Sequence, residues 1–305
     1  MKSRGFITIA TGSLKYYKLA AQLLRSYRIH GGSSAPFAII CDQENSYTQE
    51  FDEVIKIEAP NKSYMDKLLL YLYSPYDETI FIDADSLVLS DISILWEDYA
   101  DEDDVSCCGV TYPVNSNRGW FTYEGAGKYK KSIHCVIDLH GGIYYFRRTE
   151  RCQEIFKTAI EIANDYKNYT FKSFSKPADE PVIALSMAIH QCHPCEKTAR
   201  VLFVPSYRGK ISVNCDGELF IRGKKKQIEI LHFSTPNTDL FIYQYLVALQ
   251  RNGKLSYIGR FRMYVSVFFK TMPSKCKAVL RHTIGAVLRK LLPAETVQKL
   301  KERVR

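Results

Sequence analysis

The sequence has no run of eighteen or more uncharged apolar residues, so we expect no transmembrane helix. No secretion leader is recognisable, because Met1–Arg4 leads directly into the strand-like stretch Phe6–Ala10. The nine cysteines are odd in number, scattered, and mostly set within apolar stretches. In a chain without a secretion signal, such cysteines are more typical of reduced thiols than of a disulfide framework. We therefore expect a cytoplasmic protein.

Two motifs that would define other kinds of site are absent or incomplete. No G-x-G-x-x-G follows the first predicted strand, which argues against a dinucleotide-binding Rossmann domain. Cys192 and Cys195 have C-x-x-C spacing, but no second pair accompanies them, so they supply at most half of a zinc site. We expect a reduced turn at the end of a helix, and a small structural metal site is the alternative.

What is present is an ordinary globular composition over 305 residues, with 46% hydrophobic and 25% charged residues. The net charge of +9 is unevenly distributed. Residues 254–305 hold 13 Lys and Arg against 2 Asp and Glu, which leaves 29 against 31 for the rest of the chain. The basic character therefore belongs to a C-terminal segment. It suggests an appendage for an anionic surface, either a membrane or a nucleic acid.

Strand-like and helix-like stretches alternate along the first 250 residues, which predicts an α/β fold with a mostly parallel sheet covered by helices on both faces. Ligands in such sheets bind beyond the carboxyl ends of the strands. The predicted strands include Phe6–Thr11, Pro36–Cys41, Val54–Ile57, Ile80–Ile82, Val105–Val110, Val201–Val204 and Gln227–Phe233, and the predicted helices include 16–28, 64–73, 150–166 and 182–190.

The stretch Thr79–Asp91, T-I-F-I-D-A-D-S-L-V-L-S-D, carries the strongest chemical signal. A short apolar run ends at Asp83 and Asp85, and ionised carboxylates at the mouth of a buried strand resist desolvation. A divalent cation relieves that penalty, and carboxylate oxygens suit Mg²⁺ or Mn²⁺ bound to a pyrophosphate. The alternative is a strand that ends in a solvated acidic turn.

Three later stretches are weaker candidates. Residues 111–132 have little periodicity and predict a long surface loop, whose aromatic residues would either stack on a sugar or clamp the loop to the body. Asp179 and Glu180 lie near a helix N-terminus, where acidic side chains commonly cap. His232 ends an apolar strand, where a lone histidine is usually a core residue.

Most of the first 250 residues resemble a GT-A-type glycosyltransferase, similar to family-eight enzymes of the glycogenin and bacterial lipopolysaccharide galactosyltransferase kind. Four pieces occur in the family's order: I-A-T-G-S-L-K-Y near the N-terminus, a basic residue at Lys67, F-I-D-A-D-S-L-V-L-S-D-I around the two acids, and H-F at His232.

The resemblance implies a metal-dependent, mostly retaining transferase that uses a nucleotide-sugar donor, with UDP the expected nucleotide. Mn²⁺ or Mg²⁺ would be held by Asp83, Asp85 and His232. The donor would lie near the following residues: Ala10, Thr11, Gly12, Tyr16, Lys67, Ala84, Gly141 and Gly142. A carboxylate, Asp179 or Glu180, would stabilise the oxocarbenium-like transition state.

Three departures from the family pattern matter. The family's N-S/A-G is replaced by His140-Gly141-Gly142, which would alter a polar contact to the sugar. The family's D-Q pair corresponds to Asp179-Glu180, which places an acid where the family has an amide. The lysine that usually follows H-F is also missing, so a phosphate contact would come from elsewhere, from Lys210 or the tail, or be absent.

We therefore predict a GT-A-like catalytic domain over residues 1–250 and a basic amphipathic helical tail over 251–305. Apolar residues between 276 and 292 fall on one helical face flanked by basic residues, which is typical of an anchor at an anionic membrane surface or of a helix packed on the body. An anchor would place the enzyme on the inner membrane face, near a lipid-linked or glycan acceptor. Nucleic acid is an unlikely partner, because the basic residues accompany a large apolar face. The alternative functions are a non-catalytic glycan- or membrane-binding module and a sugar nucleotidyltransferase.

Overall fold

The computed structural model describes residues 3–32, 34–100, 103–172, 176–195, 200–253, 255–273 and 276. The chain divides into two compact units. The first comprises Met1–Ile211 and Leu219–Asn237, and the second comprises Ser212–Glu218 and Thr238–Arg305. This division does not test the predicted domain boundary at residue 250, which stays a prediction.

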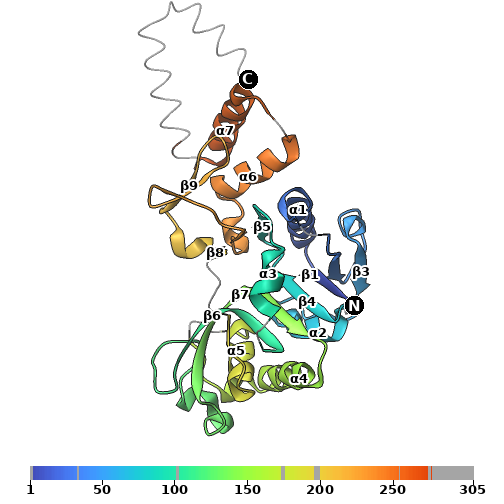
Figure 1. Cartoon of the computed structure of the whole chain (residues 1–305), viewed down its shortest axis with the longest axis vertical. Helices are drawn as coiled ribbons and strands as arrows, with labels where there is room; N and C mark the ends of the chain where they lie inside the picture. The colour runs from blue at the N-terminus through green and yellow to red at the C-terminus, as the bar shows by residue number, and fades with distance from the viewer. Residues whose placement is uncertain are drawn as a thin grey trace, which may run out of the picture. The chain divides into compact units, whose positions relative to one another are not determined.

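The first unit is built around a six-stranded sheet (Figure 1). Its strands are β1 (Arg4–Ala10), β2 (Phe37–Cys41), β3 (Glu53–Lys56), β4 (Glu78–Ile82), β6 (Val105–Pro113) and β7 (Cys135–Arg147). The order across the sheet is β3-β2-β1-β4-β7-β6. The first four strands in that order run parallel, whereas β7 is antiparallel to both β4 and β6. The predicted mostly parallel sheet is therefore confirmed.

Helices cover both faces of this sheet. The helices of the first unit are α1 (Leu14–His30), α2 (Leu70–Tyr73), α3 (Ile94–Ala100), α4 (Glu150–Asn164) and α5 (Asp179–Ile189), with short 3-10 helices η1 (Thr48–Glu50), η2 (Tyr64–Leu69), η3 (Glu124–Tyr129), η4 (Tyr166–Asn168), η5 (Val204–Tyr207) and η6 (Thr235–Asn237). Successive strand residues point to opposite faces. Phe6 contacts Tyr27 of α1, with ring centroids 5.1 Å apart, while its neighbour Ile7 belongs to the core shared with α4 and α5.

The order of the strands creates a crevice at the carboxyl ends of β1 and β4. The chain passes from β1 to β2 and β3 on one side, and then returns to β4 on the other side of β1. Neighbouring parallel strands whose connections leave in opposite directions leave a gap above their carboxyl ends, where ligands bind in open α/β sheets. Asp83 follows β4 directly and Thr11 follows β1, so both lie at this edge.

A second, three-stranded sheet brings a distant segment to the same edge. It consists of β5 (Ser86–Val88), β12 (Ile230–His232) and β8 (Val201–Phe203), in the order β5-β12-β8. The strand β12 runs antiparallel to β5, and His232 pairs with Ser86. Since Ser86 comes directly after Asp85, this register sets His232 beside the two acids, although almost 150 residues separate them in the chain.

The predicted helix from about residue 63 to 73 forms as two shorter pieces, η2 followed by α2. The side chain of Ser63 accepts a hydrogen bond from Met65 N at the start of η2. The tighter 3-10 turn buries Asp66 and Lys67 instead of exposing them on the surface of a regular helix. It thereby directs a lysine towards the carboxyl end of β4.

Residues 111–132 are more ordered than the predicted surface loop. The strand β6 continues to Pro113, and η3 occupies residues 124–129. Phe121 is completely buried, and Trp120 Nε1 donates a hydrogen bond of 2.7 Å to Leu139 O. These two aromatic side chains hold the segment to the body, as in the clamp that the sequence left as one of two alternatives. Most of the segment lies at the surface as predicted, but it contains regular structure at 111–113 and 124–129, and Phe121 belongs to the core.

The second unit contains the helices α6 (Phe241–Asn252) and α7 (Tyr257–Thr271), which pack through the rings of Phe241, Tyr245 and Tyr264. The short strand β9 (Ile211–Val213) crosses from one unit to the other, and the hairpin of β10 (Leu219–Ile221) and β11 (Lys224–Lys226) belongs to the first. Among the described residues, none of the helices has both the length and the apolar character to span a bilayer. The amphipathic segment predicted for 276–292 lies outside the described residues, apart from Cys276.

Candidate functional site

Three potential metal ligands converge at the end of β4. One ligand atom from each of Asp83, Asp85 and His232 lies within 4.8 Å of the other two. His232 Nε2 is 3.0 Å from Asp85 Oδ1 and 3.6 Å from Asp83 Oδ2. Within the described part of the chain this is the one cluster of its kind, and Cys192 and Cys195 are not part of such a cluster. Both of those cysteines are buried free thiols.

The turn from β4 into β5 fixes the directions of the two carboxylates. Asp83 N donates to Gly142 O at 3.0 Å, and Asp83 Oδ1 accepts a hydrogen bond from Ala84 N at 2.9 Å. On the other side of the turn, Asp85 Oδ2 accepts a hydrogen bond of 2.9 Å from the hydroxyl of Thr235. Each carboxylate thus has one oxygen fixed by a neighbouring residue of the turn or of the following segment and one oxygen facing His232, and the Asp83 oxygen that faces His232 also contacts Lys67.

The electrostatics of the cluster favour a bound cation. Burial raises the pKa of Asp83 even though Lys67 opposes the shift. Burial also acts on Asp85, but its contacts with His232 and Thr235 outweigh it and lower the pKa of that carboxyl. Asp85 Oδ1 is buried and lies 3.0 Å from His232 Nε2 without an aligned hydrogen bond. Two carboxylate oxygens and an imidazole nitrogen are a donor set that suits Mn²⁺ or Mg²⁺, and the residues present fit such an ion.

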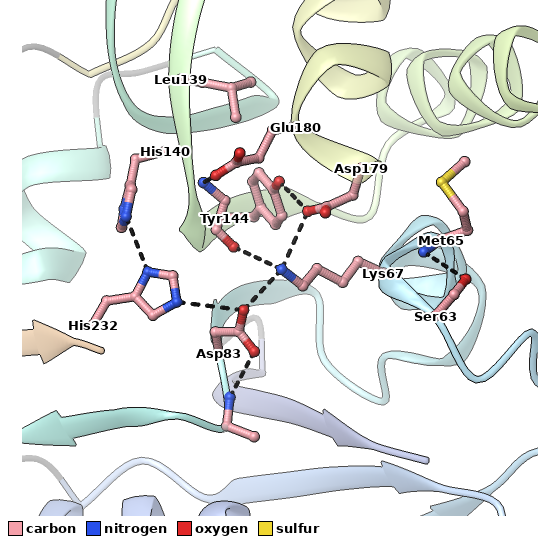
Figure 2. Close-up of polar contacts among 12 residues, drawn as sticks. Ser63, Met65, Lys67, Asp83, Leu139, His140, Tyr144, Asp179, Glu180 and His232 are labelled. Atoms are coloured by element: carbon pink, nitrogen blue, oxygen red, sulfur yellow. Dashed lines mark hydrogen bonds and ion pairs between the residues drawn. The ribbon is translucent and has the colours of Figure 1, made fainter. Parts of the chain in front are cut away.

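Lys67 joins this cluster to the helix α5. Its ammonium group is 2.8 Å from Asp83 Oδ2, 3.1 Å from Gly141 O and 3.3 Å from Asp179 Oδ2 (Figure 2). Burial alone would lower the pKa of this lysine, but the carboxylates of Asp179 and Asp83 raise it above its ordinary value. Lys67 therefore stays protonated and supplies a fixed positive charge at the site.

Asp179 and Glu180 are the first two residues of α5, and their side chains form hydrogen bonds with residues of β7. Asp179 Oδ2 accepts a hydrogen bond of 2.6 Å from the Tyr144 hydroxyl, and Glu180 Oε1 accepts one of 2.6 Å from Gly141 N. Burial, reinforced by Asp179, raises the pKa of Glu180 to about 7. A Cβ atom on Gly141 would lie only 2.6 Å from Glu180 Cγ, so the glycine permits this contact.

A cavity of about 640 Å³ lies at the carboxyl edge of β1 and β4. Of the residues predicted to bind the donor or the metal, those that line it are Thr11, Tyr16, Lys67, Asp83, Ala84 and Asp85. The others are not among the lining residues. Ala10, Gly141, Gly142, Asp179 and His232 are buried, Glu180 is half-buried, and Gly12 N donates a hydrogen bond to Asp42 Oδ1. The predicted site residues therefore fall into two groups: those that line the cavity and those that do not.

Several residues at this site were not predicted from the sequence. They are Lys62 and Lys176 in the cavity lining, Thr235 on Asp85, Tyr144 on Asp179, and His140 on His232. Burial, reinforced by the neighbouring His232 and Lys67, lowers the pKa of His140 to about 3. His140 was noted in the sequence only as a departure at the sugar contact, and its contact with His232 was not predicted. Lys210, which the sequence offered as a phosphate contact, does not line the cavity.

No protein-family model and no curated protein matches the chain. Solved structures do. The galactosyltransferase LgtC, in complex with donor and acceptor sugar analogues, superposes with a TM-score of 0.51 at 13% identity, over 90% of this chain and 99% of that one. An active-site variant of LgtC superposes with a TM-score of 0.52 at 14% identity over the same shares of the two chains. The protein has the fold of these glycosyltransferases.

The bifunctional glycosyltransferase WbbM also superposes on this chain, with a TM-score of 0.51 at 12% identity, over 86% of this chain and 52% of its own. The predicted GT-A fold is therefore confirmed. On the GT-A fold of this chain, Asp83 and Asp85 stand as an Asp-Xaa-Asp pair directly after a central strand.

Proposed function

We propose that this protein is a metal-dependent glycosyltransferase that moves a sugar, with retention, from a UDP-linked donor to a glycan or lipid-linked acceptor. The observation that carries the proposal is the convergence of Asp83, Asp85 and His232 at the edge of a 640 Å³ cavity on a GT-A fold. The volume is within the range of small-molecule and cofactor sites. The alternatives, a non-catalytic module and a sugar nucleotidyltransferase, become outcomes of the test below.

Asp83, Asp85 and His232 are the residues that would hold Mn²⁺ or Mg²⁺. When bound, the ion would act as a Lewis acid towards the diphosphate of the donor. Burial and the neighbouring Asp85 raise the pKa of Asp83, so a cation beside the two carboxylates would relieve the cost of ionising Asp83. Thr11, Tyr16 and the exposed Lys62 and Lys176 line the rest of the cavity, where nucleoside and phosphate groups would contact them.

Sugar transfer breaks the bond between the anomeric carbon and the diphosphate, so negative charge develops on the leaving group. Lys67 supplies a buried positive charge close to that group, which stabilises it more strongly than a solvated lysine would. The anomeric carbon becomes oxocarbenium-like, and a nearby carboxylate stabilises it electrostatically. Asp179, which contacts Lys67 directly, and Glu180 are the carboxyl groups proposed for this role. Both would act from behind Lys67, because neither lines the cavity.

The second unit offers a surface suited to a lipid-linked acceptor. Among the described residues of α7, large apolar side chains are exposed at Tyr257, Ile258, Phe261, Phe268 and Phe269. Aromatic residues beside a strongly basic segment are typical of contact with an anionic membrane surface. Co-sedimentation with vesicles that contain anionic lipid checks this part, and equal binding to neutral vesicles would contradict the electrostatic component.

The decisive experiment measures release of UDP or GDP from a panel of nucleotide-sugars, with and without Mn²⁺. We expect slow Mn²⁺-dependent hydrolysis of one UDP-sugar by the wild-type chain. Asp85→Asn should reduce that rate about 100-fold or more. The asparagine side chain keeps only an uncharged amide oxygen, which is a poorer metal ligand than a carboxylate. Glu97→Gln, an equivalent change at an exposed position outside the site, should leave the rate unchanged.

The outcomes separate the three functions. A protein that binds no nucleotide in a metal-dependent way is a binding module. One that releases pyrophosphate from a nucleoside triphosphate and a sugar phosphate is a nucleotidyltransferase. Either result would overturn the proposal.

A further inference from the structure

Two histidine rings meet beside the proposed metal site. His140 Nε2 lies 3.0 Å from His232 Nδ1, and the ring centroids are 4.7 Å apart with an interplanar angle of 65°. Figure 2 shows the two rings pointing at each other, with the opposite edge of His232 turned towards Asp83. Phe203 packs against both imidazoles, with centroid distances of 4.8 Å to His140 and 5.4 Å to His232. The phenyl ring of Phe203 therefore contacts both histidines of the pair.

An irregularity in the sheet brings His140 to this position. Cys107 of β6 pairs with Tyr144, but the next residue, Cys108, pairs with His140. Gly141, Gly142 and Ile143 therefore have no partner on β6, and β7 bulges at this point. Bulges re-aim side chains and are frequent beside active sites.

Gly142 makes room for the histidine pair. A Cβ atom at this residue would lie 2.4 Å from His232 Nδ1 and 2.8 Å from His140 Cε1. Both distances are shorter than any real Cβ contact, so a side chain here would push the two rings apart. The two imidazole rings occupy the space that a side chain at this position would need.

The geometry of the pair restricts where the proton lies. Two ring nitrogens at 3.0 Å share one proton, because two lone pairs or two N–H groups facing each other would repel. If His140 donates, His232 carries its own proton on Nε2, which then faces the carboxylates and cannot bind a cation. If the neutral His232 ring donates from Nδ1, the lone pair of Nε2 faces Asp83 and Asp85, where a cation takes the place of the proton that a charged ring would carry. Only the second arrangement makes His232 a ligand.

We propose that His140 is a positioning residue: it accepts a hydrogen bond from His232 Nδ1 and so holds the His232 ring in the orientation and tautomer that bind a divalent cation. The proposal rests on the proposed function, because it presupposes that Asp83, Asp85 and His232 hold such a cation. Metal-binding histidines commonly donate their second nitrogen to a carboxylate or carbonyl, and here a second histidine takes that place. His140 Nε2 is then engaged by the protein instead of by the donor sugar.

The experiment measures Mn²⁺ affinity by the loss of the free-ion electron paramagnetic resonance signal, for Mn²⁺ alone and with UDP. His140→Phe keeps a ring against Phe203 but removes the acceptor, and we expect the dissociation constant for Mn²⁺ to rise about 10- to 100-fold. His140→Gln places a carbonyl oxygen near the position of Nε2 and should restore most of the affinity. The same histidine-to-phenylalanine change at the exposed His134 is the matched control and should have no effect.

The results distinguish failure of this inference from failure of the proposed function. Equal Mn²⁺ affinity in wild type and His140→Phe would overturn the positioning role and leave the metal-dependent transferase intact. Loss of affinity in both His140→Phe and His140→Gln, with unchanged thermal denaturation, would also overturn it, because the acceptor would then not be what matters. If the wild-type chain bound no Mn²⁺ with or without UDP, the metal site itself would be refuted, and this proposal with it.

Discussion

Lys67 Nζ donates a hydrogen bond of 2.8 Å to Asp83 Oδ2, although only 8% of the lysine side chain is exposed. A buried ammonium group is tolerated when carboxylates and a carbonyl oxygen surround it, as Asp83, Asp179 and Gly141 do here. The interaction couples the end of β4 to the start of α5. Stability and the proposed chemistry therefore depend on the same contact.

Replacing Lys67 with methionine should lower the free energy of unfolding by about 3–5 kcal/mol, because it leaves two carboxylates without their buried cationic partner. Urea denaturation near neutral pH measures this loss. Lys62→Met is the matched control: the Lys62 side chain is 59% exposed, and its nearest carboxylate oxygen is 3.8 Å away, on Asp42. Its loss should change stability by less than about 0.5 kcal/mol. Similar losses in both variants would contradict the structural role of Lys67.

Glu180→Gln should make the free energy of unfolding less dependent on pH. The pKa of Glu180 is raised from 4.5 to about 7, so the folded state holds a proton that the unfolded state releases. Between about pH 4.5 and pH 7 this difference makes the wild-type chain lose stability as the pH rises. The variant keeps an oxygen that can accept the hydrogen bond from Gly141 N but cannot ionise.

Denaturation of wild type and Glu180→Gln at pH 5, 6, 7 and 8 measures the effect. The variant should be more stable by less than about 1 kcal/mol at pH 5 and by about 3 kcal/mol at pH 8, since each unit of pKa shift corresponds to about 1.4 kcal/mol. A stability difference that does not change with pH would show that Glu180 is not protonated in the folded protein near neutrality.

Phe121→Ala tests whether the segment after β6 is held by its aromatic residues. Phe121 is completely buried, and removing its ring should cost about 3–5 kcal/mol of stability through lost burial and a residual cavity. Leu72→Ala, at a side chain that is 66% exposed, should have little effect in the same denaturation assay. A small effect of Phe121→Ala would favour an aromatic group available for stacking on a sugar.

Thr235→Val tests the hydroxyl that contacts Asp85. Its hydrogen bond of 2.9 Å holds Asp85 Oδ2, and groups that orient ligands in this way commonly contribute 10- to 100-fold to metal affinity. We expect about a tenfold rise in the dissociation constant for Mn²⁺, measured by titration calorimetry. Thr235→Ser keeps the hydroxyl and should bind as the wild type does, and a serine variant as weak as the valine variant would argue that the methyl group matters instead.

Much of the fold could be predicted because it follows local patterns. The apolar run before Asp83 predicts a buried strand, and the alternation of strands with helices predicts a parallel sheet with its ligand site at one edge. For the segment around Trp120 and Phe121 the sequence left two alternatives, because residue spacing alone does not show which surface an aromatic side chain packs against. That surface is provided by residues such as Leu139 of β7, which is close in space for reasons of sheet pairing.

The candidate site likewise contains some residues that the sequence predicts and some contacts that it does not. Asp83 and Asp85 are recognisable because two acids directly after an apolar strand are unusual in one short stretch. The contacts of Tyr144 with Asp179 and of Glu180 with Gly141 leave no trace in residue spacing, because each depends on how α5 packs against β7. The pKa of Glu180 likewise depends on burial, which is a property of the assembled core.

The sequence by itself determined the alternation of elements, the acids after β4 and the basic character of residues 254–305, since these are properties of neighbouring residues. Only the tertiary structure decided that His140 faces His232. Three residues of β7 bulge out of register with β6, and β12 pairs with β5 rather than with another edge. Both depend on hydrogen bonds between strands far apart in the chain, whose register is set by the packing of the whole sheet.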